Sequence, residues 1–131
     1  GAAAANAAVS IIEDEGLVEK VKIKGEKFLS RLKHFEERFP FVGEVRGLGL
    51  FLGIELVKDR QTKEPLSAAV CKQVFEKCLQ RGLLTMSYAA SFRIQPAMTI
   101  SDEELECGFE ILNEVFEDLE KTGIWKEGKV P

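Results

Sequence analysis

The sequence lacks the features that mark a nucleic-acid-binding or membrane-spanning protein. Its 18 Lys and Arg residues are outnumbered by 22 Asp and Glu, which gives a formal net charge of −4. Such a chain offers no positive field for a polyanion, so we expect no nucleic-acid partner. Its apolar runs are strand-sized and are broken by Glu55 and Lys58, far short of the roughly 20 residues that cross a bilayer. We therefore expect no membrane association.

Cysteine and histidine are also scarce. The three cysteines Cys71, Cys78 and Cys107 form no CxxC pair and cannot all be bridged within the chain, which is typical of a reducing compartment. The N-terminal residues show neither a charged leader with a long apolar core nor an arginine-rich presequence, so we expect a cytoplasmic protein. His34 is the single histidine, and we expect no metal site.

What is present is enough for one domain. The 131 residues, 45% of them hydrophobic, can bury one core but not two. Residues 1–12 are alanine-rich and predict a helix that another backbone can approach closely. A second helix is expected over 17–39, since Gly16 suits the left-handed position after a helix and Pro40 ends the next. Its apolar face repeats at helical spacing and comprises Leu17, Val21, Phe28, Leu32, Phe35 and Phe39.

The centre of the chain changes to the periodicity of strands. A short strand and a tight turn are expected over 43–47, followed by a strand over 48–57. Its leucines and isoleucine alternate toward the helices, while Gly49 and Gly53 lie on the other face. Bare backbone there indicates either the close approach of a domain or ligand, or a simple bulge, and both readings fit the sequence.

The remaining segments complete the pattern. A helix is expected over 66–80, with Cys71 and Cys78 as small core residues rather than nucleophiles. Strands are expected over 83–86 and 91–94. The capping box of Ser101 and Glu104 opens a long helix that ends near Gly123, and residues 123–131, with Trp125, are predicted to form an exposed tail.

This order of elements predicts an α/β sandwich, in which a small, mainly antiparallel sheet carries helices on one face. An open face bearing Gly49 and Gly53 implies that the domain rests against something larger.

Catalytic chemistry is hard to find in the chain. The glycines at 47–49 run into a strand rather than a helix, so they do not form a dinucleotide fingerprint, and no phosphate-binding loop occurs. One histidine provides no base for a serine or cysteine, and the lysines fall on polar faces or in loops. We predict no catalytic or cofactor-binding residue here.

Arg93 is the exception. It stands between Phe92 and Ile94 in a short apolar strand, where a guanidinium needs an anionic partner. That partner is either a substrate carboxylate, held through two parallel hydrogen bonds, or a strand neighbour such as Glu55. Arg46, in a predicted turn, is a weaker candidate.

Several stretches together resemble one known family. They are residues 42–50 (VGEVRGLGL), 53–59 (GIELVKD), 81–84 (RGLL), 92–96 (FRIQP) and 100–104 (ISDEE). In order and spacing they resemble the C-terminal domain of class III pyridoxal-phosphate-dependent aminotransferases, the group that contains the 4-aminobutyrate, ornithine and acetylornithine enzymes. The likeness runs from Ala2 to about Leu119.

The resemblance implies that residues 1–131 are the small domain of a larger, homodimeric aminotransferase, and that residues 1–14 begin an interdomain helix. Pyridoxal 5'-phosphate and its lysine would belong to a large domain outside this chain, which alone would be inactive. The enzyme would move an amino group between an amino acid or ω-amino acid and a 2-oxo acid. Arg93 matches the family's substrate-carboxylate arginine, although Pro96 is followed by Ala97 and Met98 where relatives often read Pro-Leu.

Two other functions are compatible with the sequence. The strands and helices after residue 40 can be drawn as a stand-alone ferredoxin-like module that binds a small acid, which should cover or polarise its glycine-bearing face. A purely structural dimerisation piece fits the alanine-rich first helix but leaves Arg93 unexplained.

Overall fold

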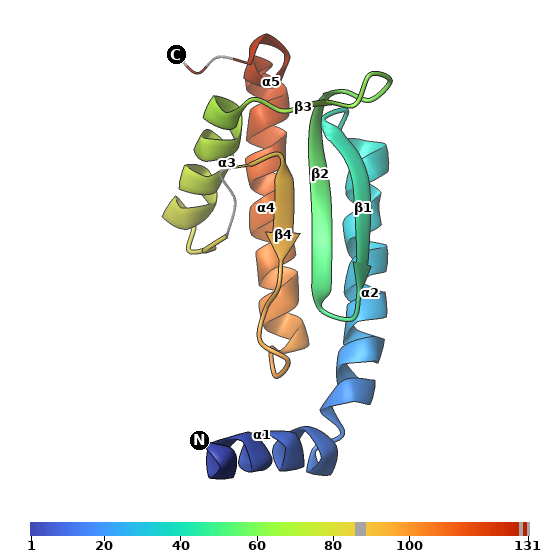
Figure 1. Ribbon diagram of the computed structural model, residues 1–131. Coiled ribbons are helices and arrows are strands. Elements are labelled where there is room, and N and C mark those ends of the chain that lie inside the picture. The colour runs from blue at the N-terminus through green and yellow to red at the C-terminus, as the bar shows by residue number, and fades with distance from the viewer. Residues whose placement is uncertain (86–88, 129, 131) are drawn as a thin grey trace.

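The computed structural model describes residues 1–85, 89–128 and 130. Strands lie on one side of the molecule and helices α2, α3 and α4 on the other, while α1 projects from one end (Figure 1). In chain order the elements are α1 (Ala2–Asp14), α2 (Leu17–Arg38), β1 (Val42–Leu48), β2 (Phe51–Asp59), β3 (Glu64–Pro65), α3 (Ala68–Gln80), β4 (Ser91–Ile94), α4 (Asp102–Thr122) and α5 (Ile124–Glu127). The predicted α/β fold is confirmed.

β2 is the central strand of the sheet. It pairs with β1 through a hairpin, and further pairs with β4 over residues 52–55 and with the short β3 near Val57 and Asp59. Every one of these pairings is antiparallel, as the sequence predicted. Helices α2 and α4 lie behind the strands and α3 lies beside α4, so one sheet face is covered (Figure 1).

The helix boundaries follow local chemistry. Gly16 and Gly123 adopt φ of 60° and 67° at the ends of α1 and α4, a left-handed conformation that glycine takes without steric penalty. The Ser101 side chain accepts the backbone N–H of Glu104, and the Glu104 carboxylate reaches back to the Ser101 backbone. The predicted capping box is therefore confirmed.

The core is a phenylalanine cluster between the sheet and the two long helices. Phe35 stacks on Phe109 with ring centroids 4.7 Å apart, and Phe116 meets Phe35, Phe39 and Phe41 edge-on at 5.2 to 5.5 Å. Such offset and edge-to-face pairs add about 0.5–1.5 kcal/mol each beyond the burial of their area. The helices are thus fixed firmly to the inner face of the sheet.

The hairpin turn lies two residues later than the sequence predicted. β1 continues to Leu48, which is 87% exposed, and the turn is formed by Gly49 and Leu50. Gly49 has φ of 56° and therefore reverses the chain there. It does not lie on the open face: its backbone packs against Gly25 of α2, where a methyl group would overlap the Gly49 carbonyl.

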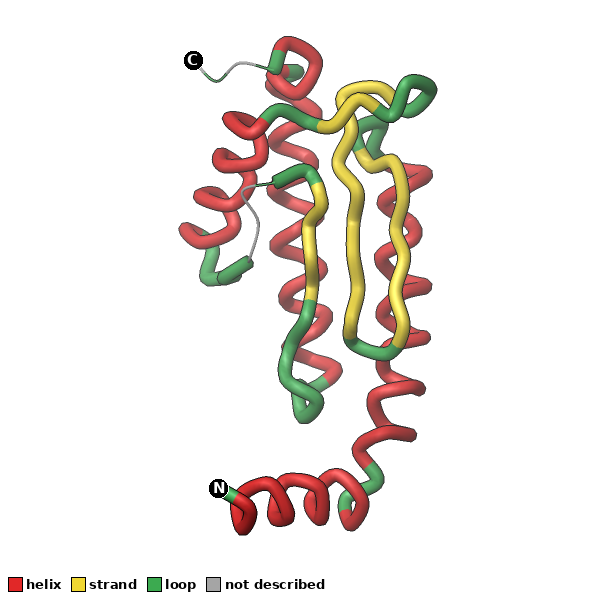
Figure 2. The backbone as a smooth tube through the Cα atoms, viewed as in Figure 1, coloured by secondary structure: helices red, strands yellow, loops and turns green. Residues whose placement is uncertain are grey.

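The strand predicted over 83–86 is not found at residues 83–85, which form a loop (Figure 2), and Met86 lies outside the described residues. The Leu83 N–H donates to the Cys78 carbonyl while the Gly82 N–H donates to Leu79, which closes the end of α3. This donor is therefore unavailable to a sheet. The ferredoxin-like alternative, which required that strand, loses its support.

The exposed tail predicted for residues 123–131 is also wrong at its start. Gly123 turns the chain into α5, which buries Ile124 and Trp125. The Trp125 ring lies 5.6 Å from that of Phe41. Burial of the indole removes a large apolar area from water. This gain is greater than the cost of ordering the short polar segment around Trp125. No helix in the described ranges is long and apolar enough to cross a membrane.

Candidate functional site

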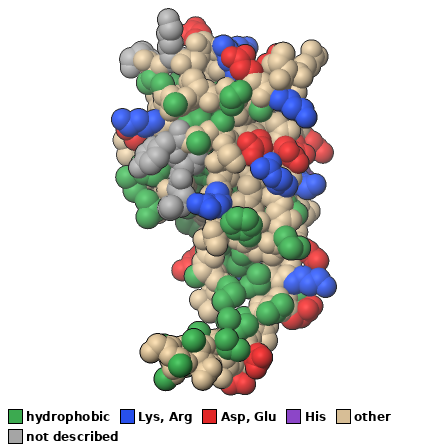
Figure 3. All heavy atoms as spheres, in the orientation of Figure 1, with side chains coloured by type: hydrophobic (Ala, Val, Ile, Leu, Met, Phe, Trp, Pro, Cys, Tyr) green, Lys and Arg blue, Asp and Glu red, His purple; other side chains and the backbone are tan. Residues whose placement is uncertain are grey.

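The uncovered sheet face presents one group of side chains from three strands. Alternation along each strand directs these residues outward: Glu44, Arg46 and Leu48 from β1, Phe51, Gly53 and Glu55 from β2, and Ser91 and Arg93 from β4. We call this set the open face. Figure 3 shows its charged side chains over the upper part of the sheet and apolar side chains below, toward α1.

The strand register sorts these residues into rows. Gly53 is opposite Arg46 on one side and opposite Arg93 on the other. In the next row, Glu55 is opposite both Glu44 and Ser91. Two guanidinium groups therefore flank a strip of bare backbone, with two carboxylates immediately beside them.

Gly53 leaves open space between the two arginines. A Cβ built on it would meet no heavy atom within 4 Å. The register irregularity of the hairpin lies between Val42 and Glu44, so Gly53 is not a bulge residue. Of the two readings of this glycine, the close approach of another group is the one that the geometry supports.

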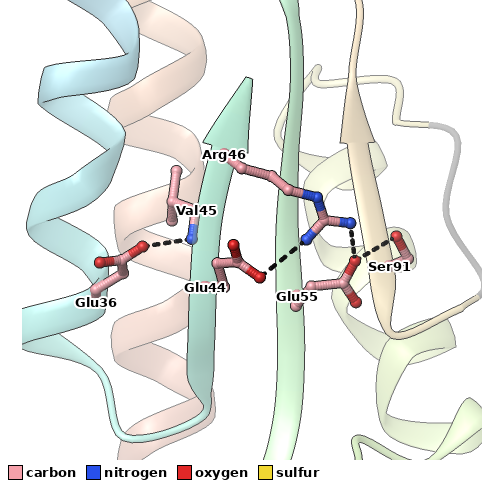
Figure 4. A network of polar contacts seen from close by, with 6 residues as sticks. All are labelled: Glu36, Glu44, Val45, Arg46, Glu55 and Ser91. Carbon is pink, nitrogen blue, oxygen red and sulfur yellow. Dashed lines mark hydrogen bonds and ion pairs between the residues drawn. The ribbon is translucent and has the colours of Figure 1, made fainter. Parts of the chain in front are cut away.

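Arg46 is engaged within the sheet. Its guanidinium contacts a Glu55 carboxylate oxygen at 2.5 Å and the Glu44 carboxylate at 3.4 Å (Figure 4). The hydrogen bond to Glu55, then the charge of Glu55, raises the pKa of Arg46. The Ser91 hydroxyl donates to the same Glu55 oxygen at 2.9 Å. Glu36 of α2 meanwhile accepts the Val45 N–H at 2.5 Å and so fixes β1 to the helix.

Arg93 is exposed and differs from Arg46 in its surroundings. Within residues 1–85, 89–128 and 130, no side chain forms an ion pair with its guanidinium. Glu55, its alternative partner, is occupied by Arg46 and Ser91. The strand salt bridge is therefore not the arrangement that forms, and Arg93 faces outward as an available cation.

The segment after Arg93 is held by helix contacts. The Ile100 N–H donates to the Ala97 carbonyl at 3.1 Å, which closes a turn after Pro96. Lys24 of α2 donates to the Ile100 carbonyl from the other side. Arg93 therefore projects from a strand whose exit is anchored to α2.

A pocket of about 160 Å³ lies next to β4, on the side of α4. Its walls are mostly apolar, and Thr85 adds a buried hydroxyl that finds no hydrogen-bond partner in the described part of the chain. No pattern in the sequence singled out Thr85, which stood within a predicted strand. Arg93 also contributes to the lining, so the space adjoins the arginine row.

Lysine, histidine and cysteine side chains are the groups that bear on cofactor and metal binding. No lysine among residues 1–128 is buried, and His34 is exposed. In the same part of the chain, no three His, Cys, Asp or Glu side chains are grouped as metal ligands. Cys71 and Cys78 are buried, which raises the pKa of each to about 11 and keeps both thiols neutral. Cys107 is exposed on α4, and the open face presents the Arg93 guanidinium outward.

Comparisons with known proteins identify the family of the chain. Residues 1–116 match the family model "Aminotransferase class-III". The chain belongs to the class III aminotransferase family.

Three similar proteins illustrate the range of that family. The taurine–pyruvate aminotransferase of Bilophila wadsworthia is 45% identical over 93 residues, 71% of this chain and 20% of its own length. The isoleucine 2-epimerase of Lentilactobacillus buchneri is 38% identical over 119 residues, 90% of this chain and 26% of its own. A PLP-bound amine transaminase from an uncultivated Pseudomonas species superposes with a TM-score of 0.83 at 30% identity, over 88% of this chain and 27% of that one. The chain thus spans about a quarter or less of the curated relatives named here.

Proposed function

We propose that this chain is the small C-terminal domain of a pyridoxal-phosphate-dependent aminotransferase, to which it contributes the arginine that binds the substrate carboxylate. The observation that carries the proposal is Arg93, an outward-facing guanidinium opposite the bare backbone of Gly53. The family match over residues 1–116 and the short share of each relative support a larger enzyme around it.

Arg93 would act by binding and orientation. A guanidinium can hold a carboxylate through two parallel charge-assisted hydrogen bonds, which fixes the substrate in angle as well as in position. Such positioning lowers the entropic part of the barrier to the following reaction. Amino transfer itself would depend on pyridoxal phosphate held by residues outside this chain.

The substrates would be an amino acid or ω-amino acid as donor and a 2-oxo acid as acceptor. Support comes from the names of relatives, which include taurine–pyruvate and 5-aminovalerate aminotransferases. We place the enzyme in the cytoplasm, where its three free cysteines would remain reduced. A homodimer is proposed from the family resemblance, and the 131 residues alone should be inactive.

The exposed parts of the chain are consistent with a large domain as neighbour. α1 contains no buried residue, although Val9 and Ile11 lie on it, and Leu48 and Phe51 are exposed at one end of the open face. Contiguous apolar surface of this kind marks contact sites. A large domain seated there would also exclude water around Arg93, which strengthens its pairing with a carboxylate.

The first experiment is the intact mass of the protein from its source, before and after borohydride reduction. Reduction makes the bond between a lysine and pyridoxal phosphate stable, so a much larger subunit that gains this adduct supports the proposal. The purified protein should then transfer an amino group to pyruvate or 2-oxoglutarate. A bare 14.6 kDa species without the adduct would contradict it.

Racemisation is the second candidate, because relatives with 36–38% identity are named as a racemase and an epimerase. The two reactions differ in product: amino transfer yields a new 2-oxo acid, whereas racemisation yields only the opposite enantiomer. Chiral chromatography of each reaction mixture separates them. Formation of the enantiomer without any 2-oxo acid would replace the aminotransferase proposal.

A further inference from the structure

The open face carries equal numbers of positive and negative side chains, yet they are not paired one to one. Arg46 contacts both Glu44 and Glu55, whereas Arg93 contacts neither. Two carboxylates therefore converge on the guanidinium of Arg46 (Figure 4), whereas neither of them contacts Arg93. The question is why Glu55 pairs with Arg46 rather than with Arg93.

Glu55 is close enough to Arg93 to be its partner. Glu55 is opposite Ser91, and Arg93 is two residues further along the same strand, on the same face. Such diagonal neighbours on adjacent strands lie about 7–8 Å apart at their backbones, within reach of long side chains. The residue between them on β2 is Gly53, which has no side chain to obstruct the contact.

We propose that Arg46 is a positioning residue for the carboxylate site: by holding Glu55, it prevents Glu55 from pairing with Arg93 and so keeps Arg93 free for substrate. The inference rests on the proposed function, since it concerns the availability of the same arginine. Arg46 itself would touch no substrate and would act only through Glu55.

The contacts explain why Glu55 stays where it is. One of its oxygens receives both Arg46 at 2.5 Å and the Ser91 hydroxyl at 2.9 Å. Arg46 is further steadied by Glu44 on its own strand. Without Arg46, the Glu55 carboxylate would keep only the serine as a described partner, and Arg93 would be the nearest cation on the face.

A released Glu55 would compete strongly with substrate. A group tethered this closely acts at an effective concentration in the millimolar range or above, comparable with or higher than a free substrate. Loss of Arg46 should therefore raise KM for carboxylate-bearing substrates by about tenfold. The loss should be confined to those substrates, since a donor amine without a carboxylate does not use Arg93.

The first test uses nuclear magnetic resonance on the full-length protein and needs no activity. In Arg46→Met, Arg93 should gain a carboxylate partner. Its Nε–Hε signal should therefore shift, and the exchange of this proton with water should become slower. In the double variant Arg46→Met/Glu55→Gln the signal should return to its original position. An Arg93 signal that does not respond to Arg46→Met would overturn the inference, whether or not the parent is an aminotransferase.

The second test uses the full-length enzyme. Arg46→Met should raise KM for the carboxylate substrate about tenfold, and Glu55→Gln added to it should restore KM to within about twofold. The conservative variant Arg46→Lys should have a KM close to that of the wild type, because a lysine can still hold Glu55. If Glu55→Gln fails to restore KM, Arg46 has only a structural role and the inference is wrong.

Two controls separate the possible failures. Arg93→Met removes the proposed carboxylate site itself, so an unchanged KM in that variant would contradict the proposed function rather than the role of Arg46. Should Arg46→Met not fold, Arg46→Gln with and without Glu55→Gln gives the same comparison. If KM is no lower in Arg46→Gln/Glu55→Gln than in Arg46→Gln alone, the inference is again contradicted.

Discussion

The two faces of the sheet are made from the same strands but have opposite character. On the inner face, Ile54 and Phe92 are 0% and 2% exposed and pack into the helix-covered core. On the open face, the adjoining Glu55 and Arg93 are charged, and Phe51 is 57% exposed. One step along the backbone therefore separates a buried core residue from a charged residue of the open face. The alternation of strands thus allows outward-facing residues to change without loss of the core.

The largest difference between the faces should appear at the adjoining pair Phe92 and Arg93. Phe92→Ala should lower the free energy of unfolding by about 3–5 kcal/mol, since it leaves a cavity in a packed core. Arg93→Ala should change it by less than about 0.5 kcal/mol, because its side chain has no described ion pair to lose. Urea unfolding of both variants measures the contrast. Equal destabilisation would mean that Arg93 is a structural residue.

Two glycines provide a second contrast. Gly25→Ala should destabilise the protein by about 1–3 kcal/mol, because its methyl group would overlap the backbone of the hairpin turn at Gly49. Gly53→Ala meets open space on the other face and should be neutral or slightly stabilising. Thermal unfolding of the pair tests this, and a Gly25→Ala protein as stable as wild type would refute the close packing of α2 on the turn.

A smaller loss of stability is expected at the capping box of α4, a helix that packs only on the inner face of the sheet. Ser101→Ala should lower the free energy of unfolding by about 1 kcal/mol at neutral pH. Hydrogen bonds from the Ser101 backbone, then from its hydroxyl, lower the pKa of Glu104 below its ordinary 4.5. Stabilisation by this carboxylate is complete above pH 4.5 and is lost as pH falls through its folded pKa.

The difference between Ser101→Ala and wild type should accordingly narrow below pH 4, in urea titrations at several pH values. A difference that is the same at pH 3 and pH 7 would show that the Glu104 carboxylate does not contribute.

The smallest expected effect is a difference in reactivity between the buried and the exposed thiols. Cys71 and Cys78 are buried and their pKa values are raised to about 11, while Cys107 is exposed. A disulfide reagent at pH 8 should modify one thiol quickly and the other two only on unfolding. Rapid reaction of all three would show that α3 is not packed as the structure describes.

Local patterns were sufficient to predict most of the helical framework. The left-handed Gly16, the capping box of Ser101 and the apolar stripes of α2 and α4 each depend on residues a few positions apart. Contacts between distant segments were harder to predict. The hairpin turn was placed too early because the packing of Gly49 on Gly25 cannot be seen from either segment alone. Trp125 was assigned to a tail because its partner Phe41 is far away in sequence.

The candidate site shows the same division. Arg93 could be singled out from its apolar neighbours within one strand. The absence of an ion pair between Arg93 and Glu55 could not be predicted. It depends on the strand register, which brings Arg46 and Ser91 to the Glu55 carboxylate. The strand predicted over 83–86 failed similarly, since the Leu83 N–H is used to close α3.

The role of Arg93 is decided by how Arg93→Lys changes substrate discrimination in the full-length enzyme. A lysine keeps the charge but cannot form the two parallel hydrogen bonds of a guanidinium. We predict a fall in kcat/KM for the carboxylate-bearing substrate of about tenfold or more, with much less change for a donor amine that lacks a carboxylate. Unchanged kinetics for every donor and acceptor would contradict the assignment of Arg93 as the carboxylate-binding residue.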